Sequence, residues 1–291
     1  MKRVIRKLAL YNSAKYIYYS FGQYRRHLRN LFKPTARILI YHRIADPQND
    51  PYLLCVSPQN FHAQIKFLKE NFRVVPLVQL VQEVRSKKLK NETVAITFDD
   101  GYVDNLHNAL PILEEYGVPA TIFITAGYVG GSKPFYWDAP EGVDLNERVP
   151  MAKPSRILDR VGTTSELGRP MTIDEAKTLS GAHLIEIGGH TISHPKLDKI
   201  PENDQFREIA GGKRIIEKML DIPLLSFAYP FGGKDSFDKT TIELVKKAGF
   251  QYACSNIHKR VTNRSNVYAL PRFIARNWNI EEFKKEMTKW V

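Results

Sequence analysis

The chain has 291 residues, and its 43% hydrophobic and 25% charged content is typical of a protein that buries a core, which argues against a disordered chain. Lysine and arginine outnumber aspartate and glutamate by 43 to 31, a formal charge of +12. This charge indicates an anionic partner such as a membrane surface, a phosphorylated substrate or nucleic acid, or it serves solubility alone. No run of 18 or more apolar residues occurs, so no membrane-spanning helix is predicted.

The first 35 residues differ from the rest of the chain. They contain nine basic residues, no acidic ones and seven interleaved aromatic residues. This pattern favours a helix lying on anionic lipid, and the alternative is a helix packed on the protein with its basic face in water. No continuous apolar run of the secretory type follows Met1. We therefore expect a cytoplasmic protein that lies at the inner face of the membrane.

Two cysteines, Cys55 and Cys254, form no CxxC pair, which favours a reducing compartment while leaving one long-range disulfide open. The length allows two domains or one barrel of about 250 residues. We assign residues 1–35 to a basic helical extension and residues 36–291 to a single catalytic domain.

Short apolar segments alternate with helical patterns after residue 36. The expected strands are 37–41, 74–75, 93–96, 119–125, 184–187, 224–229 and 251–255. The expected helices are 58–68, 76–88, 106–116, one starting after Thr172, 203–220, 238–248 and 281–291. Residues 127–170 are rich in glycine and proline and are expected to form a long insertion. The alternation predicts a parallel α/β fold, either a (β/α) barrel or an open doubly wound sheet.

Polar residues gather where the expected strands end. They are His42, Asp99, Asp100, His190, Tyr229 and Arg272. The carboxyl ends of parallel strands form the active site of a (β/α) barrel, and an open sheet binds ligands at the same edge. No glycine-rich nucleotide fingerprint follows any strand, and no nucleic-acid-binding module accompanies the basic segment, which argues against nucleotide or nucleic-acid binding.

A metal site is the simplest explanation for the polar residues at two of these strand ends. Asp99 and Asp100 follow a buried strand, where unpaired charge is costly. His190 and His194 are four residues apart, so on one helical turn both rings would face the same way. Two histidines, one carboxylate and a water form a common catalytic coordination set for zinc. Taken separately, the aspartates could cap a turn and the histidines could lie on a surface helix.

Three motifs together resemble the polysaccharide deacetylase family, also called the NodB-homology family or carbohydrate esterase family 4. They are Thr97–Gly101, the His-Thr-x-x-x-His segment 190–194 after two glycines, and Phe227–Gly232. The resemblance covers about residues 37–275, and segments 40–44 and 56–61 resemble the branch of the biofilm poly-N-acetylglucosamine deacetylases. It implies a distorted barrel of seven or eight (β/α) units, a divalent metal, and hydrolysis of N-acyl groups on sugars.

The resemblance also implies roles for single residues. Asp100, His190 and His194 match the metal ligands, with zinc expected and cobalt, nickel, manganese or iron as alternatives. Asp99 matches the general base. Tyr229 and Pro230 match the motif that lines the substrate groove, whose backbone helps to hold the oxyanion. Tyr102 and Trp137 are further expected substrate-binding residues.

The sequence departs from the family pattern at two places. Many members carry an arginine two residues before the groove proline, where it pairs with the base, but here that residue is Ala228. We expect Arg272 to take over this role, the alternative being a surface arginine. The late Leu-x-His motif that supplies the catalytic acid in many members is also missing. The branch that the chain resembles implies that an early Tyr-His enters the site, so we nominate His42, at the end of the first expected strand, as acid or substrate ligand, with a buried structural histidine as the alternative.

The expected reaction is removal of an N-acetyl group from an amino sugar in a surface polysaccharide or its lipid- or nucleotide-linked precursor. Deformylation of a lipid-linked formamido sugar is an alternative within the same chemistry. A non-catalytic carbohydrate-binding relative is an alternative from another class.

Overall fold

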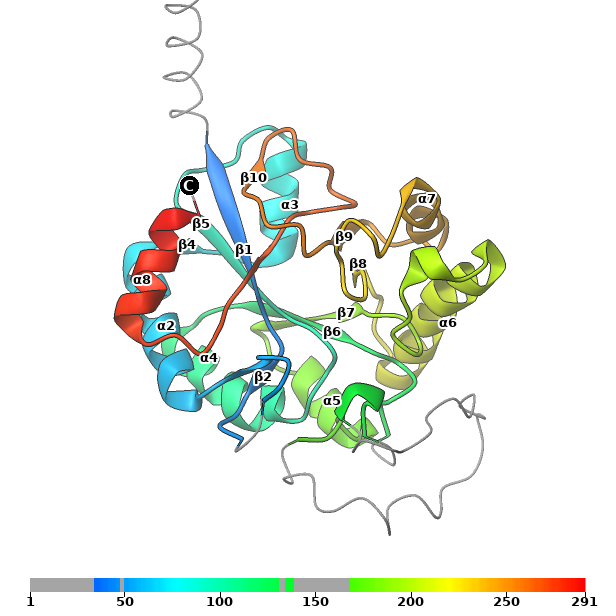
Figure 1. Cartoon of the computed structure of the whole chain (residues 1–291), viewed down its shortest axis with the longest axis horizontal. Helices are drawn as coiled ribbons and strands as arrows, with labels where there is room; N and C mark the ends of the chain where they lie inside the picture. Colours follow the sequence, from blue (N-terminus) through cyan, green and yellow to red (C-terminus); the bar gives the residue numbers. More distant parts are fainter. Residues whose placement is uncertain (1–33, 48–49, 131–133, 139–167, 291) are drawn as a thin grey trace, which may run out of the picture. The chain divides into compact units, whose positions relative to one another are not determined.

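A computed structural model describes residues 34–47, 50–130, 134–138 and 168–290 (Figure 1). The expected N-terminal helix and most of the 127–170 insertion lie outside these residues, so both stay predictions, as does the domain boundary near residue 35. Among the described residues, no helix has the length and apolar character needed to cross a membrane.

Strands and helices alternate along the chain, as the sequence predicted. The strands are β1 (Thr35–Tyr41), β2 (Arg43–Ile44), β3 (Cys55–Val56), β4 (Arg73–Val74), β5 (Thr93–Phe98), β6 (Ala120–Ile124), β7 (Ile185–Gly189), β8 (Ser226–Ala228), β9 (Tyr252–Cys254), β10 (Val261–Thr262) and β11 (Phe273–Ile274). The helices are α2 (Pro58–Asn71), α3 (Leu77–Arg85), α4 (Leu110–Tyr116), α5 (Ile173–Ser180), α6 (Glu202–Leu220), α7 (Lys239–Lys247) and α8 (Ile280–Lys289). Short helical turns cover Asn105–Ala109, Tyr136–Asp138 and Leu197–Lys199.

Local sequence signals explain where several helices begin and end. Ser57 caps α2 by accepting a hydrogen bond from the Asn60 N–H. Thr172 and Glu175 form the reciprocal capping box expected for α5. Gly117 ends α4 in the left-handed conformation, with φ of 57°, which glycine adopts without steric cost.

The main sheet runs in the order β10-β1-β5-β6-β7-β8-β9, and all its pairings are parallel except the one between β10 and β1. A single segment near the C-terminus joins its two ends. Leu270 bridges to Cys254 on β9, and three residues later β11 pairs in parallel with β1. The sheet thereby closes into the distorted (β/α) barrel that the sequence predicted.

The helices surround the curled sheet (Figure 1). One apolar core lies between the outer helices and the sheet, with buried residues such as Phe61, Leu113 and Ile209. A second core includes Ile38 of β1 and Leu80 of α3. The fold therefore buries its strands and leaves their carboxyl ends as the place where polar side chains converge.

Candidate active site

The predicted polar residues meet at the carboxyl ends of the barrel strands. Asp99 and Asp100 directly follow β5, His190 directly follows β7, and Arg272 lies just before β11 in the segment that closes the sheet. All four side chains are buried. These side chains converge because β5 and β7 are parallel strands separated only by β6, so their carboxyl ends lie at the same edge of the sheet.

Asp100, His190 and His194 form a candidate metal centre. One ligand atom from each of the three lies within 4.8 Å of the others. Nε2 of both histidines is 3.6 Å from Oδ1 of Asp100, which is too long for a hydrogen bond. Ligands of one tetrahedral zinc ion lie roughly 3.4 Å apart, given metal–ligand bonds of about 2.1 Å. The spacing therefore fits a shared cation.

The charges and protonation states in the cluster fit a cation as well. Nδ1 of His190 donates to the Ala228 carbonyl across 2.7 Å, which leaves the Nε2 lone pair free for a metal. Burial lowers the pKa of both His190 and His194, so both rings are neutral, as ligands must be. Burial and the neighbouring Asp99 raise the pKa of Asp100 well above its ordinary range, as expected of a carboxyl group that a cation would otherwise compensate.

The expected helical turn carrying His190 and His194 is wrong. Residues 190–194 are not helical, and Thr191 and His194 have φ of 68° and 62°. The two rings converge because of this left-handed backbone, and their centroids are 4.8 Å apart. Pro195 was the sequence signal against a helix, since proline disfavours helical geometry in the preceding residue. Asp100, at φ of 75°, is the second of the candidate ligands, after His194, with a left-handed backbone, and such strain often accompanies functional sites.

Arg272 forms the predicted ion pair with Asp99. Its two terminal nitrogens donate to the two carboxylate oxygens of Asp99, each across 2.7 Å. The remaining donors bind the Ser255 carbonyl at 3.1 Å, the Thr97 hydroxyl at 3.1 Å and the Asn256 side-chain oxygen at 2.7 Å. All five N–H bonds of the guanidinium are thus used. The catalytic roles of the pair stay predictions.

This ion pair controls the charge of Asp99. Burial alone would raise the pKa of its carboxyl group, but the charge of Arg272 and the hydrogen bonds from it lower the pKa to about 2. Asp99 is therefore ionised throughout the physiological pH range.

His42 directly follows β1 and lies within electrostatic reach of Asp99, Arg272 and His190. Its side chain is half-buried, and the atoms packed around it lower its pKa to about 4 through desolvation. The ring is therefore neutral at pH 7. Its position fits a group that meets the substrate, and its role as acid stays a prediction.

Aromatic side chains surround His194. The ring centroids of Trp137 and Phe231 lie 4.5 and 4.9 Å from that of His194. Trp137 donates its indole N–H to the Tyr102 hydroxyl, which donates to Asp138. Trp137 is therefore held beside the candidate metal centre, in keeping with its expected contact with substrate.

Two expected substrate contacts need correction. The Tyr102 side chain is fully buried, so it supports Trp137 and does not present a surface to the substrate. The Tyr229 ring is also buried, and its hydroxyl donates to the Tyr268 carbonyl. The Tyr229 N–H donates to the Cys254 carbonyl within the sheet, so it is not free to hold an oxyanion. Pro230 is buried in the same segment.

The comparisons with known proteins agree with this geometry. A family model described as polysaccharide deacetylase matches residues 86–253. The chain belongs to the polysaccharide deacetylase family. A poly-beta-1,6-N-acetyl-D-glucosamine N-deacetylase of Staphylococcus aureus is 27% identical over 239 residues, which cover 81% of this chain and 71% of that protein.

Two solved structures of deacetylases share the fold. The Streptococcus pyogenes deacetylase PplD, in complex with acetate, has a TM-score of 0.66 at 19% identity, covering 88% of this chain and 99% of that one. IcaB from Ammonifex degensii has a TM-score of 0.63 at 19% identity, covering 88% of this chain and 97% of that one. At this identity the likeness shows the distorted barrel fold alone.

The polysaccharide deacetylase chain has further residues at the site that the sequence analysis did not single out. Phe231 is 44% exposed beside His194 and stands in a left-handed conformation with φ of 60°. Asn256 joins Phe231 to the ion pair, because its side-chain N–H2 donates to the Phe231 carbonyl while its oxygen accepts from Arg272. Phe231 belongs to the Phe227–Gly232 motif, whereas nothing in the sequence pointed to Asn256.

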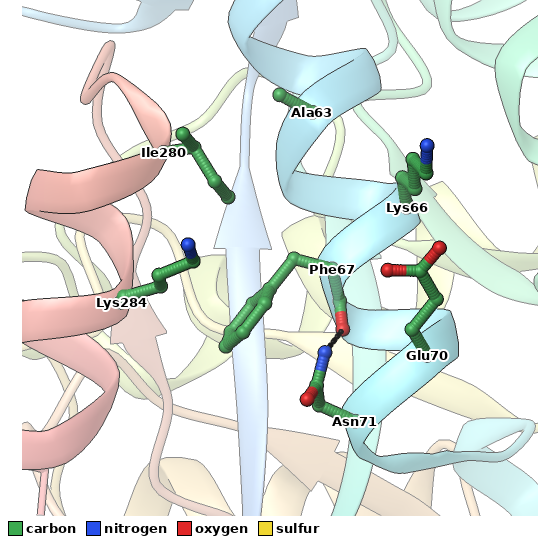
Figure 2. A pocket seen from close by; sticks show the side chains of 7 residues that line it. All are labelled: Ala63, Lys66, Phe67, Glu70, Asn71, Ile280 and Lys284. Carbon is green, nitrogen blue, oxygen red and sulfur yellow. Dashed lines mark hydrogen bonds between the residues drawn. The ribbon is translucent and has the colours of Figure 1, made fainter.

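A groove of about 330 Å³ lies elsewhere on this deacetylase, between α2 and α8 (Figure 2). Its lining consists of Ala63, Lys66, Phe67, Glu70, Asn71, Ile280 and Lys284. None of the predicted site residues contributes to it, so it is separate from the candidate active site.

Proposed function

We propose that this chain is a metal-dependent hydrolase that removes the N-acetyl group from an amino sugar in a surface polysaccharide or in its lipid- or nucleotide-linked precursor. The observation that carries the proposal is the buried Asp100–His190–His194 cluster beside the ion-paired Asp99 at the strand ends of the barrel. The name of the Staphylococcus aureus relative supports N-acetylglucosamine as the sugar.

Hydrolysis of an amide needs an activated water, relief of the charge on the acyl oxygen and a proton for the leaving amine. Asp100, His190 and His194 would hold the cation, for which zinc is the expected metal. Bound there, a divalent cation supplies Lewis-acid activation of water and of the acyl oxygen. The protein supplies the remaining functions through its own side chains.

Asp99 accepts a proton from the attacking water in this proposal. It is ionised at neutral pH, and Arg272 fixes the orientation of its carboxylate through two parallel hydrogen bonds. Arg272 occupies only part of the accepting capacity of each oxygen, because an ionised carboxylate offers about four lone-pair sites. Asp99 can therefore bind the water while it stays paired with Arg272.

His42 passes a proton to the departing amine. The ring is neutral at pH 7, so it must gain a proton during turnover before it can donate one. The attacking water provides both protons that the amide nitrogen needs, since hydrolysis converts an amide and water into a carboxylate and an ammonium group. No external acid is then required.

A screen for released acid tests this function. Purified metal-loaded protein is incubated with N-acetyl and N-formyl amino sugars that are free, oligomeric, nucleotide-linked or lipid-linked, and acetate and formate are measured. We expect acetate. Release of formate alone would support a deformylase, and sugar binding without release of either acid would support a non-catalytic relative.

We also propose that the chain acts at the cytoplasmic face of an anionic membrane through residues 1–35. Nine of the 43 basic residues and none of the 31 acidic residues fall in this segment, with aromatic residues between them. Co-sedimentation with vesicles containing anionic lipid, with and without residues 1–35, tests the proposal. Equal binding of the two proteins would contradict it.

A further inference from the structure

The loop that carries both histidine ligands is held from two sides. On the β6 side, Ala126 and Gly127 donate backbone hydrogen bonds of 2.9 and 2.8 Å to the carbonyls of Thr191 and Ile192. On the α6 side, one Oε of Glu208 accepts hydrogen bonds of 2.9 Å from the N–H groups of both Ile192 and Ser193.

Glu208 also binds the Ser193 side chain. Its second carboxylate oxygen accepts a hydrogen bond of 2.9 Å from the Ser193 hydroxyl. Three hydrogen bonds from two consecutive loop residues thus converge on one half-buried carboxylate. Hydrogen bonds to an ionised acceptor are roughly twice as strong as neutral ones, so Glu208 fixes the loop more firmly than a neutral residue would.

Two consecutive glycines let α6 approach this loop. A Cβ atom on Gly212 would come within 2.8 Å of the Thr191 carbonyl carbon, and one on Gly211 would come within 2.8 Å of the Ile192 side chain. Glycine is unfavourable inside a helix by about 1 kcal/mol relative to alanine. Close contact with the loop is the structural reason for both glycines.

The loop needs an external constraint because its backbone is strained. Thr191 and His194 both have positive φ, and such conformations cost of order 1–3 kcal/mol each for residues other than glycine. Thr191 is β-branched, which makes this conformation especially unfavourable. The strain persists only when the surroundings determine the backbone, and Glu208 binds the two residues that lie between Thr191 and His194.

The two histidine ligands are oriented in different ways. Nδ1 of His190 is anchored by the Ala228 carbonyl. Nδ1 of His194 is buried and has no hydrogen-bond partner among the residues that the structure describes. Second-sphere hydrogen bonds normally orient metal-binding histidines, so the orientation of His194 depends on its backbone and on ring packing.

We propose that Glu208 is a positioning residue for the metal centre. It holds Ile192 and Ser193, and their backbone then directs His194 toward the other two ligands, Asp100 and His190. Gly211 and Gly212 allow α6 to come close enough for this contact. The inference rests on the metal site of the proposed function. It adds that a helix outside the barrel strands influences the affinity of the site, and it predicts weaker metal binding without any change to a ligand.

The test is a titration of the full-length, chelator-treated protein with Co²⁺, followed by the visible absorption of the bound ion. For Glu208→Ala we expect a Kd about 10–100-fold higher than that of the wild type, the range typical of losing a residue that orients a metal ligand. Glu208→Gln preserves the shape of the side chain and should fall between the two. The visible spectrum reports the geometry of coordination, which should also change in Glu208→Ala.

Glu217→Ala is the matched control, since Glu217 also lies on α6 and accepts a hydrogen bond of 2.9 Å from a backbone N–H, that of Leu224. It should lower the Tm of the metal-free protein and leave the Kd for Co²⁺ unchanged. Gly212→Ala provides a second variant if Glu208→Ala fails to fold, because it improves helix propensity while pushing the loop away. Its Kd should rise as well.

The outcomes separate the two levels of the proposal. A wild-type protein that binds no Co²⁺ would contradict the metal site itself. If the wild type binds Co²⁺ and Glu208→Ala has the same Kd, the positioning role alone is overturned. Where Glu208→Ala does not fold, an unchanged Kd in Gly212→Ala overturns that role in the same way. An equal rise in Kd for Glu217→Ala would also overturn it, because general destabilisation would then explain the loss.

Discussion

Arg272 and Asp99 are 173 residues apart in the chain and share two parallel hydrogen bonds of 2.7 Å at the end of β5. The segment that brings Arg272 there is the same one that joins β9 to β1 and closes the barrel. Closure of the sheet and support of the proposed base therefore depend on one stretch of chain. We propose that Arg272 in this way takes the place of the arginine that many family members carry where this chain has Ala228.

Replacing Arg272 by alanine should cost about 3–5 kcal/mol of unfolding free energy, because it leaves the Asp99 carboxylate buried without its partner. Turnover should fall as well. Urea unfolding and acetate release measure the two effects. The double variant Arg272→Ala/Asp99→Asn should be less destabilised than Arg272→Ala alone, since no buried charge remains. Undiminished turnover in Arg272→Ala would refute the assigned role.

Asp99→Asn should abolish turnover while the protein stays folded and still binds metal. The amide is nearly isosteric with the carboxylate but cannot accept the proton of the attacking water. His190→Ala should also abolish turnover, in this case with weaker metal binding. Circular dichroism and metal content distinguish the two variants. Near-wild-type activity in either one is incompatible with the proposed mechanism.

His42 should contribute a loss of stability to the metal-free protein on mild acidification. The pKa of its side chain is about 4 in the folded protein and about 6.5 in the unfolded chain, so the unfolded state binds more protons between these values. The contribution of His42 to the free energy of unfolding is fully present above pH 6.5 and falls by about 3 kcal/mol as the pH drops to 4.

The matched measurement is the difference between wild type and His42→Gln. Burial raises the pKa of Asp104 to about 6, so this carboxyl group acts in the opposite sense over much of the same range. Comparing the two proteins removes the contribution of Asp104. The unfolding free energy of His42→Gln should change less steeply between pH 6.5 and 4, and identical slopes would contradict the low pKa of His42.

Phe231→Ala should raise KM roughly fivefold and leave kcat nearly unchanged, because loss of an aromatic contact costs about 1 kcal/mol. Asn256→Ala should affect both constants, since Asn256 contacts the Phe231 carbonyl and Arg272. Steady-state kinetics on an N-acetylated oligosaccharide separate these effects. A change in kcat alone for Phe231→Ala would argue against its place in the substrate groove.

Much of the fold was predictable because its signals are local. The buried apolar strand expected at 93–96, the capping box at Thr172 and the helix stop at Gly117 each depend on a few neighbouring residues, and the structure extends that strand to Phe98. The grouping of Asp100 with His190 followed from parallel strands whose carboxyl ends share one edge of the sheet. The partner of Asp99 was inferred from the absence of arginine at position 228.

The features that escaped prediction depend on contacts between distant segments. The left-handed backbone at Thr191 and His194 is stabilised by Glu208 from α6, and a histidine spacing of four gave the opposite, helical expectation. The hydrogen bond from the Tyr229 N–H to the Cys254 carbonyl arises from the pairing of β8 with β9, and the Phe227–Gly232 motif gave no sign of it. The pair Gly211–Gly212 inside a helical pattern was the available signal for a close contact.

Metal-dependent release of acetate is the most direct test of the proposed deacetylase activity. Zinc-loaded wild type, chelator-treated wild type and zinc-loaded Asp99→Asn are compared on N-acetylglucosamine oligomers and on lipid- and nucleotide-linked N-acetylglucosamine. The zinc-loaded wild type should release acetate from at least one of these substrates, and the other two proteins should release none. Absence of acetate on every substrate, or equal release after removal of the metal, would contradict it.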